Sequence, residues 1–144
     1  MFKNILIATD GSDLAEKAVQ QGLNVAKDLK AKAIVVRATP AARMFIAEGV
    51  VVMTSSEVRE QVVRAIDEHF ARIKMQASAV GVACETLHVE NDMPSQAILD
   101  TAKQKGCDLI VMASHGRTGF SAAFLGSETH KVLAQSTIPV LVCR

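Results

Sequence analysis

The residues from Ala113 to Ser127 combine glycines with hydroxyl, imidazole and guanidinium side chains, in the order Ala-Ser-His-Gly-Arg-Thr-Gly-Phe-Ser-Ala-Ala-Phe-Leu-Gly-Ser. Glycine lets the backbone approach a ligand closely, and the polar side chains add hydrogen-bond donors. The stretch follows an apolar run over 109–112 and precedes a helix-like run over 128–135. Phosphate is commonly held by a loop that joins a buried strand to a helix. We therefore expect this loop to bind an anion rather than a metal ion.

Gly126 and Ser127 stand directly before the expected helix. There, unpaired backbone N–H groups and the positive end of the helix dipole attract phosphate, and Ser127 could cap the helix. A loop whose glycines only form turns is the alternative, and we favour phosphate binding over it. Arg117 has two open roles, neutralising phosphate charge or extending into solvent. His115 could contact phosphate or transfer a proton, but we favour a hydrogen bond to the backbone.

Asp10 comes directly after the apolar run Lys3-Asn-Ile-Leu-Ile-Ala-Thr9 and is followed by Gly11 and Ser12. A carboxylate at the end of such a strand is a candidate acceptor for ribose hydroxyls. It could instead only cap the turn before Ser12, which itself supplies a helix N-cap. We favour the ribose contact.

Three motifs of catalysis and nucleotide binding are missing from the sequence. There is no Gly-x-Ser-x-Gly, no Gly-Lys followed by Ser or Thr, and no Gly-x-Gly-x-x-Gly. Ser114 and His115 are adjacent, and we do not expect adjacency alone to make them a serine–histidine pair. No carboxylate cluster for a metal ion is visible either. We therefore assign no catalytic residue and no metal ligand.

Alternating strand and helix patterns surround these residues. Strands are expected at 3–9, 33–38, 84–89, 108–113 and 138–143, and helices at 13–30, 58–80, 94–105 and 128–135. Because no hairpin signals interrupt them, they predict an α/β fold, a five-stranded, mainly parallel open sheet with helices on both faces. The first and fourth strands are the most continuously apolar and so the most central. Their carboxyl ends then place Asp10 beside the loop after Ala113.

Four local patterns predict how these elements pack. Gly22 lies on the apolar face of the first helix and lets it approach the sheet. The apolar face of the second helix is expected to begin at Val58, and the alternating strand 84–89 to lie near a sheet edge. The segment 41–54 is apolar without a clear period. This segment could be a mobile lid, contact a partner or be partly buried, and we favour partial burial.

The composition limits the possible functions. At 144 residues with 49% hydrophobic residues, the chain suits a single domain over 1–144. The net charge is +1 and Trp and Tyr are absent, so nucleic acid is not an expected partner. No apolar run suits a signal peptide or a membrane span, which favours a cytoplasmic protein without membrane contact. The cysteines are odd in number and far apart, as is typical of reduced thiols.

The last expected strand, Ile138 to Cys143, closes the chain and lacks the charges that protect an exposed sheet edge. Pairing with the same strand of a second copy would cover it. A twofold homodimer is the commonest assembly of this kind.

Four segments together resemble a universal stress protein of the UspA type over essentially the whole chain: Ile5-Leu-Ile-Ala-Thr-Asp-Gly-Ser12, Asp108-Leu-Ile-Val-Met-Ala-Ser-His-Gly-Arg117, Leu125-Gly-Ser127 and Pro139-Val-Leu-Val142. In the nucleotide-binding branch of that family the loop reads glycine, two residues, glycine, nine residues, glycine, then serine or threonine. Gly116 and Gly126-Ser127 match this motif with nine residues between them, and Ala113 stands at its first glycine.

The resemblance implies a Rossmann-like fold of the adenine nucleotide alpha hydrolase type, and ATP as ligand, with or without Mg²⁺ or Mn²⁺. It implies that Asp10 contacts the ribose and that the homodimer forms through the last strand. The other nucleotide-binding residues that it implies are Ala8, Thr9 and Ala38 on the adenine side, Met112 and Ala113 in the pocket floor, and Ser114, Gly116, Gly126 and Ser127 at the phosphates, with His115 and Arg117 beside them.

Three functions compete at this point. The leading hypothesis is a dimeric, ATP-binding module of the stress response that changes its partners with nucleotide state. The second is a slow ATPase that uses Asp10 or His115. The third is a nucleotide-free dimeric interaction protein in which the segment Met44 to Met53 contacts a partner.

Overall fold

The structure is a computed structural model that describes residues 1–41, 44–47, 50–53, 56–117 and 125–144; for 44–47 and 50–53 it describes the backbone only. The elements are β1 (Asn4–Ala8), α1 (Asp13–Leu29), β2 (Lys32–Thr39), β3 (Met44–Ala47), β4 (Val50–Met53), α2 (Ser56–Ala79), β5 (Cys84–Glu90), α3 (Pro94–Gln104), β6 (Leu109–Ala113), α4 (Ser127–Gln135) and β7 (Val140–Cys143).

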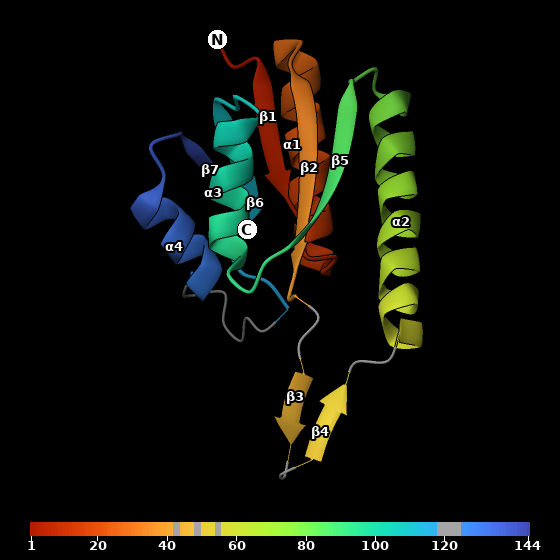
Figure 1. The fold of residues 1–144 in the computed structure, drawn as a ribbon. Helices are drawn as coiled ribbons and strands as arrows, with labels where there is room; N and C mark the ends of the chain where they lie inside the picture. The colour runs from red at the N-terminus through yellow and green to blue at the C-terminus, as the bar shows by residue number, and fades with distance from the viewer. Residues whose placement is uncertain (42–43, 48–49, 54–55, 118–124) are drawn as a thin grey trace.

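Five of these strands form one parallel sheet in the order β5-β2-β1-β6-β7 (Figure 1). This confirms the predicted fold class. It also confirms that the strand before Asp10 and the strand before Ala113 are central neighbours, since Ile5 pairs with Leu109 and Ile7 with Val111. From β1 the chain first winds toward β5 and later returns to the other side, so the strand order reverses between β1 and β6.

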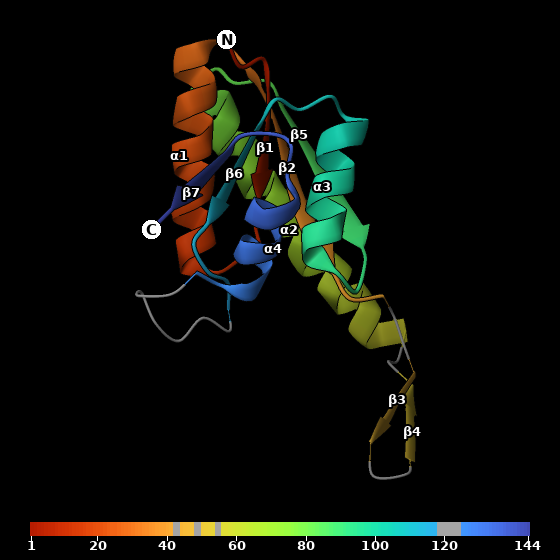
Figure 2. The ribbon, with the colours of Figure 1, turned by 90° about the vertical axis from the view of Figure 1, so that its left-hand side faces the viewer.

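Helices cover both faces of the sheet (Figures 1 and 2). Alternate residues of β1 point to opposite faces, because side chains alternate along a strand. Ile5 and Ile7 pack in a core with α1 and α2, whereas Leu6 and Ala8 pack in a second core with α3 and α4. The two cores fix the sheet between its helical layers and leave the carboxyl ends of its strands at one edge.

The structure corrects the expectation that no hairpin interrupts the alternation. β3 and β4 pair antiparallel, Met44 with Met53 and Ala47 with Val50, and they stand away from the five-stranded sheet (Figure 2). Glu48-Gly49 between two strand-length runs is a hairpin signal, but both runs are continuously apolar and so do not alternate. The side chains of 42–55 lie outside the described residues, so the proposed lid, partner or burial roles of 41–54 remain predictions.

The apolar face of α2 begins later than expected. Val58 and Val62 are 47% and 44% exposed, and continuous core contact starts at Ile66. The reason is that the first turns of α2 extend past the five-stranded sheet (Figure 1), so that none of its five strands lies against them. Within the described helices, none combines the length and apolar character needed to cross a membrane.

The two edge strands lie where the sequence placed them. β5 and β7 close the two sides of the sheet, and Leu141 of β7 is 40% exposed. Cys84, Cys107 and Cys143 are free thiols, which confirms that prediction.

α1 begins at an N-cap, since the Ser12 side chain accepts from Ala15 N, and ends at Lys30 in a left-handed conformation. Its close approach to the sheet depends on Gly22, as expected. A Cβ on Gly22 would lie 2.7 Å from Cδ1 of Ile7, a side chain with no exposed surface. Only a residue without a side chain fits this contact unchanged.

Gly22→Ala should therefore destabilise the protein, although alanine is the better helix former by about 1 kcal/mol. We expect a net loss of ~1–3 kcal/mol in the free energy of unfolding, measured by urea denaturation, because overpacking a tight core strains its neighbours. Adding Ile7→Val should recover part of that loss in the double variant. A Gly22→Ala protein more stable than the parent would show that the helix does not press on the sheet here.

Candidate functional site

A cavity of about 750 Å³ opens at the carboxyl ends of β1 and β6, where the strand order reverses. Ligands of open α/β sheets bind at such a switch point. Of the twelve predicted site residues the structure brings eleven together as cavity lining: Ala8, Thr9, Asp10, Ala38, Met112, Ala113, His115, Gly116, Arg117, Gly126 and Ser127.

Ser114 is the predicted residue that does not line this cavity. It is 5% exposed, its N–H donates to Cys143 O at 2.7 Å, and its carbonyl accepts from Gly126 N at 2.7 Å. Its hydroxyl lies 3.0 Å from Nδ1 of His115, so the expectation that adjacency would not pair these side chains is wrong. The turn after β6 folds the His115 ring back onto its neighbour. Because Ser114 is buried behind the cavity lining, the contact between Ser114 and His115 stabilises the loop and does not present the Ser114 hydroxyl to the cavity as a nucleophile.

The cavity has an apolar end that the sequence reasoning largely missed. Pro94 and Ile98, four residues apart on the first turns of α3, line it together with Val36 and Pro40 of the β2 side. The spacing of Pro94 and Ile98 was the available signal, because a helix that begins at the carboxyl edge of the sheet turns one face toward that edge. The remaining lining residues not predicted are Ala15, Leu125, Glu128 and Thr129.

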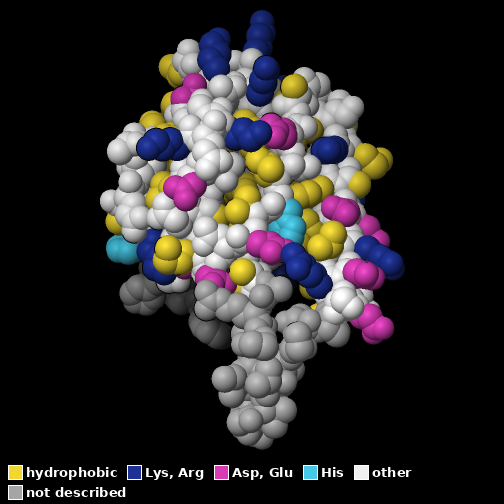
Figure 3. Space-filling model, viewed as in Figure 1, with side chains coloured by type: hydrophobic (Ala, Val, Ile, Leu, Met, Phe, Trp, Pro, Cys, Tyr) yellow, Lys and Arg dark blue, Asp and Glu magenta, His cyan; other side chains and the backbone are white. Residues whose placement is uncertain are grey.

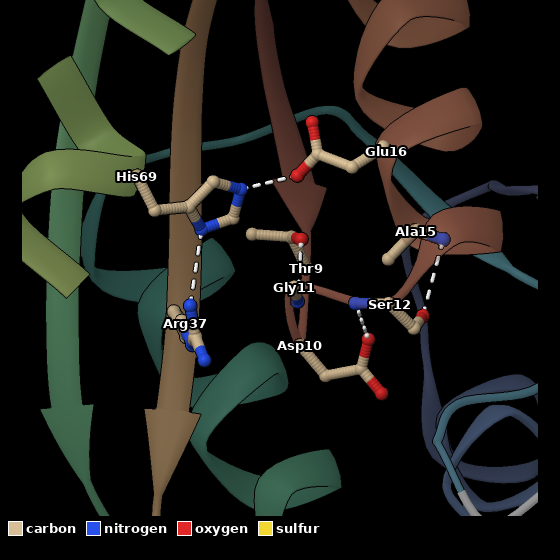
Figure 4. Close-up of polar contacts among 8 residues, drawn as sticks. All are labelled: Thr9, Asp10, Gly11, Ser12, Ala15, Glu16, Arg37 and His69. Atoms are coloured by element: carbon tan, nitrogen blue, oxygen red, sulfur yellow. Dashed lines mark hydrogen bonds and ion pairs between the residues drawn. The ribbon is translucent and has the colours of Figure 1, made fainter. Parts of the chain in front are cut away.

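Asp10 ties two distant parts of the chain together. Its Oδ1 accepts from Ser12 N at 3.0 Å and its Oδ2 accepts from Arg117 N at 2.9 Å. Partial burial acts to raise the pKa of Asp10, but hydrogen bonds from Ser12 and Arg117 and the Arg117 charge outweigh it and lower the pKa. Figure 4 shows this carboxylate at the end of β1 beside Gly11 and Ser12. A carboxylate has further lone pairs after two hydrogen bonds and can still accept one from a ligand.

Two glycines allow the loop to lie this close. A Cβ on Gly116 would be 2.5 Å from Oδ2 of Asp10, and a Cβ on Gly126 would be 2.9 Å from the His115 Cα. Ala113 needs no such freedom. Among the described residues other than glycine only Lys30 has a positive φ, so alanine fits the backbone at the first position of the loop motif.

The N-terminus of α4 faces the same cavity. The cap is Gly126, without a side-chain hydrogen bond, and Ser127 is the first helical residue, which corrects the expectation that Ser127 caps the helix. The first N–H groups of a helix have no acceptor within it. Ser127, Glu128 and Thr129 line the cavity with this turn, so its positive end is available to an anion.

Glu128 joins α4 to α3 at the cavity rim. Its Oε2 accepts from Ser95 N at 2.8 Å, and its Oε1 accepts from the Lys131 ammonium at 3.0 Å. Burial acts to raise its pKa, but the bonds from Lys131 and Ser95 prevail and lower it. Within the described ranges no three carboxylate, imidazole or thiol groups come together as a metal site.

Asp10→Asn should weaken the fold, because an amide cannot accept both backbone N–H groups through both of its terminal atoms. We expect the free energy of unfolding to fall by about 1–3 kcal/mol at pH 7. Since the folded pKa of Asp10 lies below its unfolded value, the stabilisation exists above the unfolded pKa and is lost as pH falls below about 4. Urea denaturation at pH 7 and pH 3 measures both effects.

The exposed carboxylate Asp13 provides the control, and Asp13→Asn should change stability far less. If the free energies of unfolding of Asp10→Asn and the parent differ by the same amount at pH 7 and at pH 3, the carboxylate does not clamp the loop.

Comparison with known proteins identifies the family. The family model described as "Universal stress protein family" matches residues 1–144. Universal stress protein YxiE of Bacillus subtilis is 33% identical, with all of both chains covered.

Solved structures share the fold. The structure of MJ0577 of Methanocaldococcus jannaschii has a TM-score of 0.80 and 28% identity, covering 99% of this chain and 96% of the other. The universal stress protein of Archaeoglobus fulgidus in complex with dAMP has a TM-score of 0.69 and 20% identity, covering 99% and 98%. The chain described here belongs to the universal stress protein family.

Proposed function

We propose that the protein is a cytoplasmic, homodimeric ATP-binding module of the stress response, which holds one adenine nucleotide in the cavity at the β1–β6 switch point. The observation that carries the proposal is the arrangement of that cavity. Asp10 follows β1, which lies between β2, the strand that supplies Val36 and Ala38 of the apolar end, and β6, the strand that leads into the glycine loop. These three surfaces match a base, a ribose and a phosphate chain in that order.

The apolar end suits an aromatic base. Val36, Ala38, Pro40, Ile98 and Met112 line it without a charged side chain among them, and a volume of about 750 Å³ accommodates a ligand of nucleotide size. The dAMP held by the Archaeoglobus protein of the same fold supports adenine as the base.

The phosphates would lie against Gly116, Gly126 and the first turn of α4, with Arg117 as a counter-charge. The unpaired N–H groups and the helix dipole stabilise negative charge there. A Mg²⁺ or Mn²⁺ ion would be held mostly through the phosphates, because no group of three carboxylate, imidazole or thiol side chains among the described residues offers it a site.

Binding accounts for these residues better than turnover does. Asp10 has a lowered pKa and accepts two backbone hydrogen bonds, which makes it a poor proton acceptor. The hydroxyl of Ser114 is buried. The slow ATPase remains the rival, with His115 as the cavity residue suited to proton transfer.

Ser127→Asp should abolish or weaken ATP binding while keeping α4 intact. Ser127 is an exposed residue of the first turn, where a carboxylate suits the helix dipole but repels phosphate. Titration calorimetry with ATP and Mg²⁺ should show an affinity lower by about tenfold or more. Gly126 is a poorer choice, since any side chain there collides with His115.

Ser127→Asn is the matched control, because it has the same shape without the charge, and it should bind within about threefold of the parent. Equal ATP affinities of Ser127→Asp and Ser127→Asn would show that the phosphates do not bind at the N-terminus of α4. A folded parent protein, free of retained nucleotide, that binds neither AMP nor ATP would sink the proposal and favour the nucleotide-free interaction protein.

The dimer would form through the exposed edge of β7. Its sequence Val-Leu-Val-Cys lacks charge, and Leu141 is 40% exposed, so a second copy of the strand would bury it.

Leu141→Lys should give a monomer in light scattering after size exclusion, whereas the parent elutes with the mass of two chains. Leu133→Lys, at a leucine of α4 that is 39% exposed, controls for added charge. A Leu141→Lys protein that stays dimeric would place the interface elsewhere.

A further inference from the structure

Two arginines from distant parts of the chain meet at Gly11. A Cβ on Gly11 would lie 3.0 Å from Nη1 of Arg37 and 3.1 Å from Nη2 of Arg117. Both guanidinium groups therefore surround one small volume directly after Asp10. Gly11 has a φ of 79° and no side chain, so the backbone leaves this volume to the two arginines.

Arg37 is held in this position by a chain of polar contacts that runs through the buried His69 (Figure 4). Its Nη1 lies 3.1 Å from Nδ1 of His69, and Nε2 of His69 contacts Oε1 of Glu16. His69 is 3% exposed. Because Arg37 can only donate, Nδ1 of His69 is the acceptor and Nε2 carries the hydrogen toward Glu16. Two helices, α1 and α2, thus fix the direction of one guanidinium on β2.

The Arg37 side chain lies at the edge of the sheet where the cavity opens. Figure 4 shows the Arg37 guanidinium and the Asp10 carboxylate on either side of Gly11, at the carboxyl end of β1. Arg117 lines the cavity and Arg37 does not. A ligand that reaches Arg37 must therefore extend past the cavity wall formed by Asp10 and Arg117.

Two guanidinium groups and two carboxylates act on one another around this point. Burial lowers the pKa of Arg37 first, and the positive charge of Arg117 lowers it further, while Asp10 and Glu16 raise it only in part. Two guanidinium groups this close repel each other, and a phosphate can accept from both. On the face that Figure 3 displays, several Lys and Arg side chains lie at the upper end of the molecule and others lie beside Asp and Glu side chains.

We propose that Arg37 is a specificity-determining residue, which together with Arg117 binds the terminal phosphate of the nucleotide beside Gly11. The proposal rests on the function proposed above. It follows that the site distinguishes nucleotides by the length of their phosphate chain. A monophosphate ends at the glycine loop, whereas a longer phosphate chain can follow the Arg117 side chain from the loop back toward Gly11 and Arg37.

The test compares AMP and ATP, each titrated into the parent protein, Arg37→Gln and Arg72→Gln. Arg72 is an exposed arginine of α2 and controls for the loss of one positive charge. Arg37→Gln should weaken ATP binding about tenfold, or ~1.4 kcal/mol, and change AMP binding less than about twofold. Arg72→Gln should leave both affinities unchanged.

Three results would overturn the proposal. Equal losses for AMP and ATP in Arg37→Gln would assign the arginine to support of the fold through His69, and unchanged affinities would assign it no part in binding. Inorganic phosphate that binds to the AMP-loaded parent but not to AMP-loaded Arg37→Gln, with ATP affinity unaltered, would show a separate anion site. A parent protein that binds neither nucleotide is a different outcome, since it contradicts the proposed function itself.

Discussion

The hydrogen bonds that Asp10 accepts from Ser12 and Arg117 are the interaction on which the site depends. The bond from Ser12 fixes the turn after β1, and the bond from Arg117 joins residue 10 to residue 117 and holds the loop after β6 against the end of β1. The pairing of β1 with β6 extends to Ile7 and Val111, so the bond to Arg117 continues the contact between the two segments beyond the paired residues. Gly116 is part of the same constraint, because any side chain there would collide with the carboxylate.

From this contact the rest of the cavity follows. The loop returns toward α4 through the bond from Gly126 N to Ser114 O, and Thr129 Oγ1 fixes the first turn of α4 by donating to Ala113 O. Glu128 of α4 accepts a hydrogen bond from Ser95 of α3 and so holds the two helices together. This contact places the apolar first turns of α3 against the cavity. The positive helix end, the clamped carboxylate and the apolar end thus keep fixed positions, and a bound nucleotide would require little rearrangement.

Local patterns in the sequence predicted the sheet and the position of Asp10 beside the glycine loop, whereas the other cavity residues, such as Ala8, Ala38 and Met112, were implied by the family resemblance. Continuous apolar runs identified β1 and β6 as central, and chain topology then brought Asp10 beside Gly116. Contacts between side chains on different elements could not be predicted in this way. The chain from Glu16 through His69 to Arg37 joins α1, α2 and β2, and no periodicity links those positions.

Smaller departures have equally local causes. The cap of α4 falls on Gly126, where the tight contact with His115 admits no side chain, although Ser127 has the better capping chemistry. The first turns of α2 are exposed because the sheet ends before the helix does. β3 and β4 pair although their residues do not alternate between polar and apolar.

The most direct test of this account is to titrate ATP into ¹⁵N-labelled protein and follow the backbone amide resonances. The account predicts that the largest shift changes fall on residues 9–11, 113–117 and 126–129, at the clamp, the glycine loop and the first turn of α4. Shift changes confined to α2 or β5, or none at saturating ATP, would contradict a nucleotide site at the β1–β6 switch point.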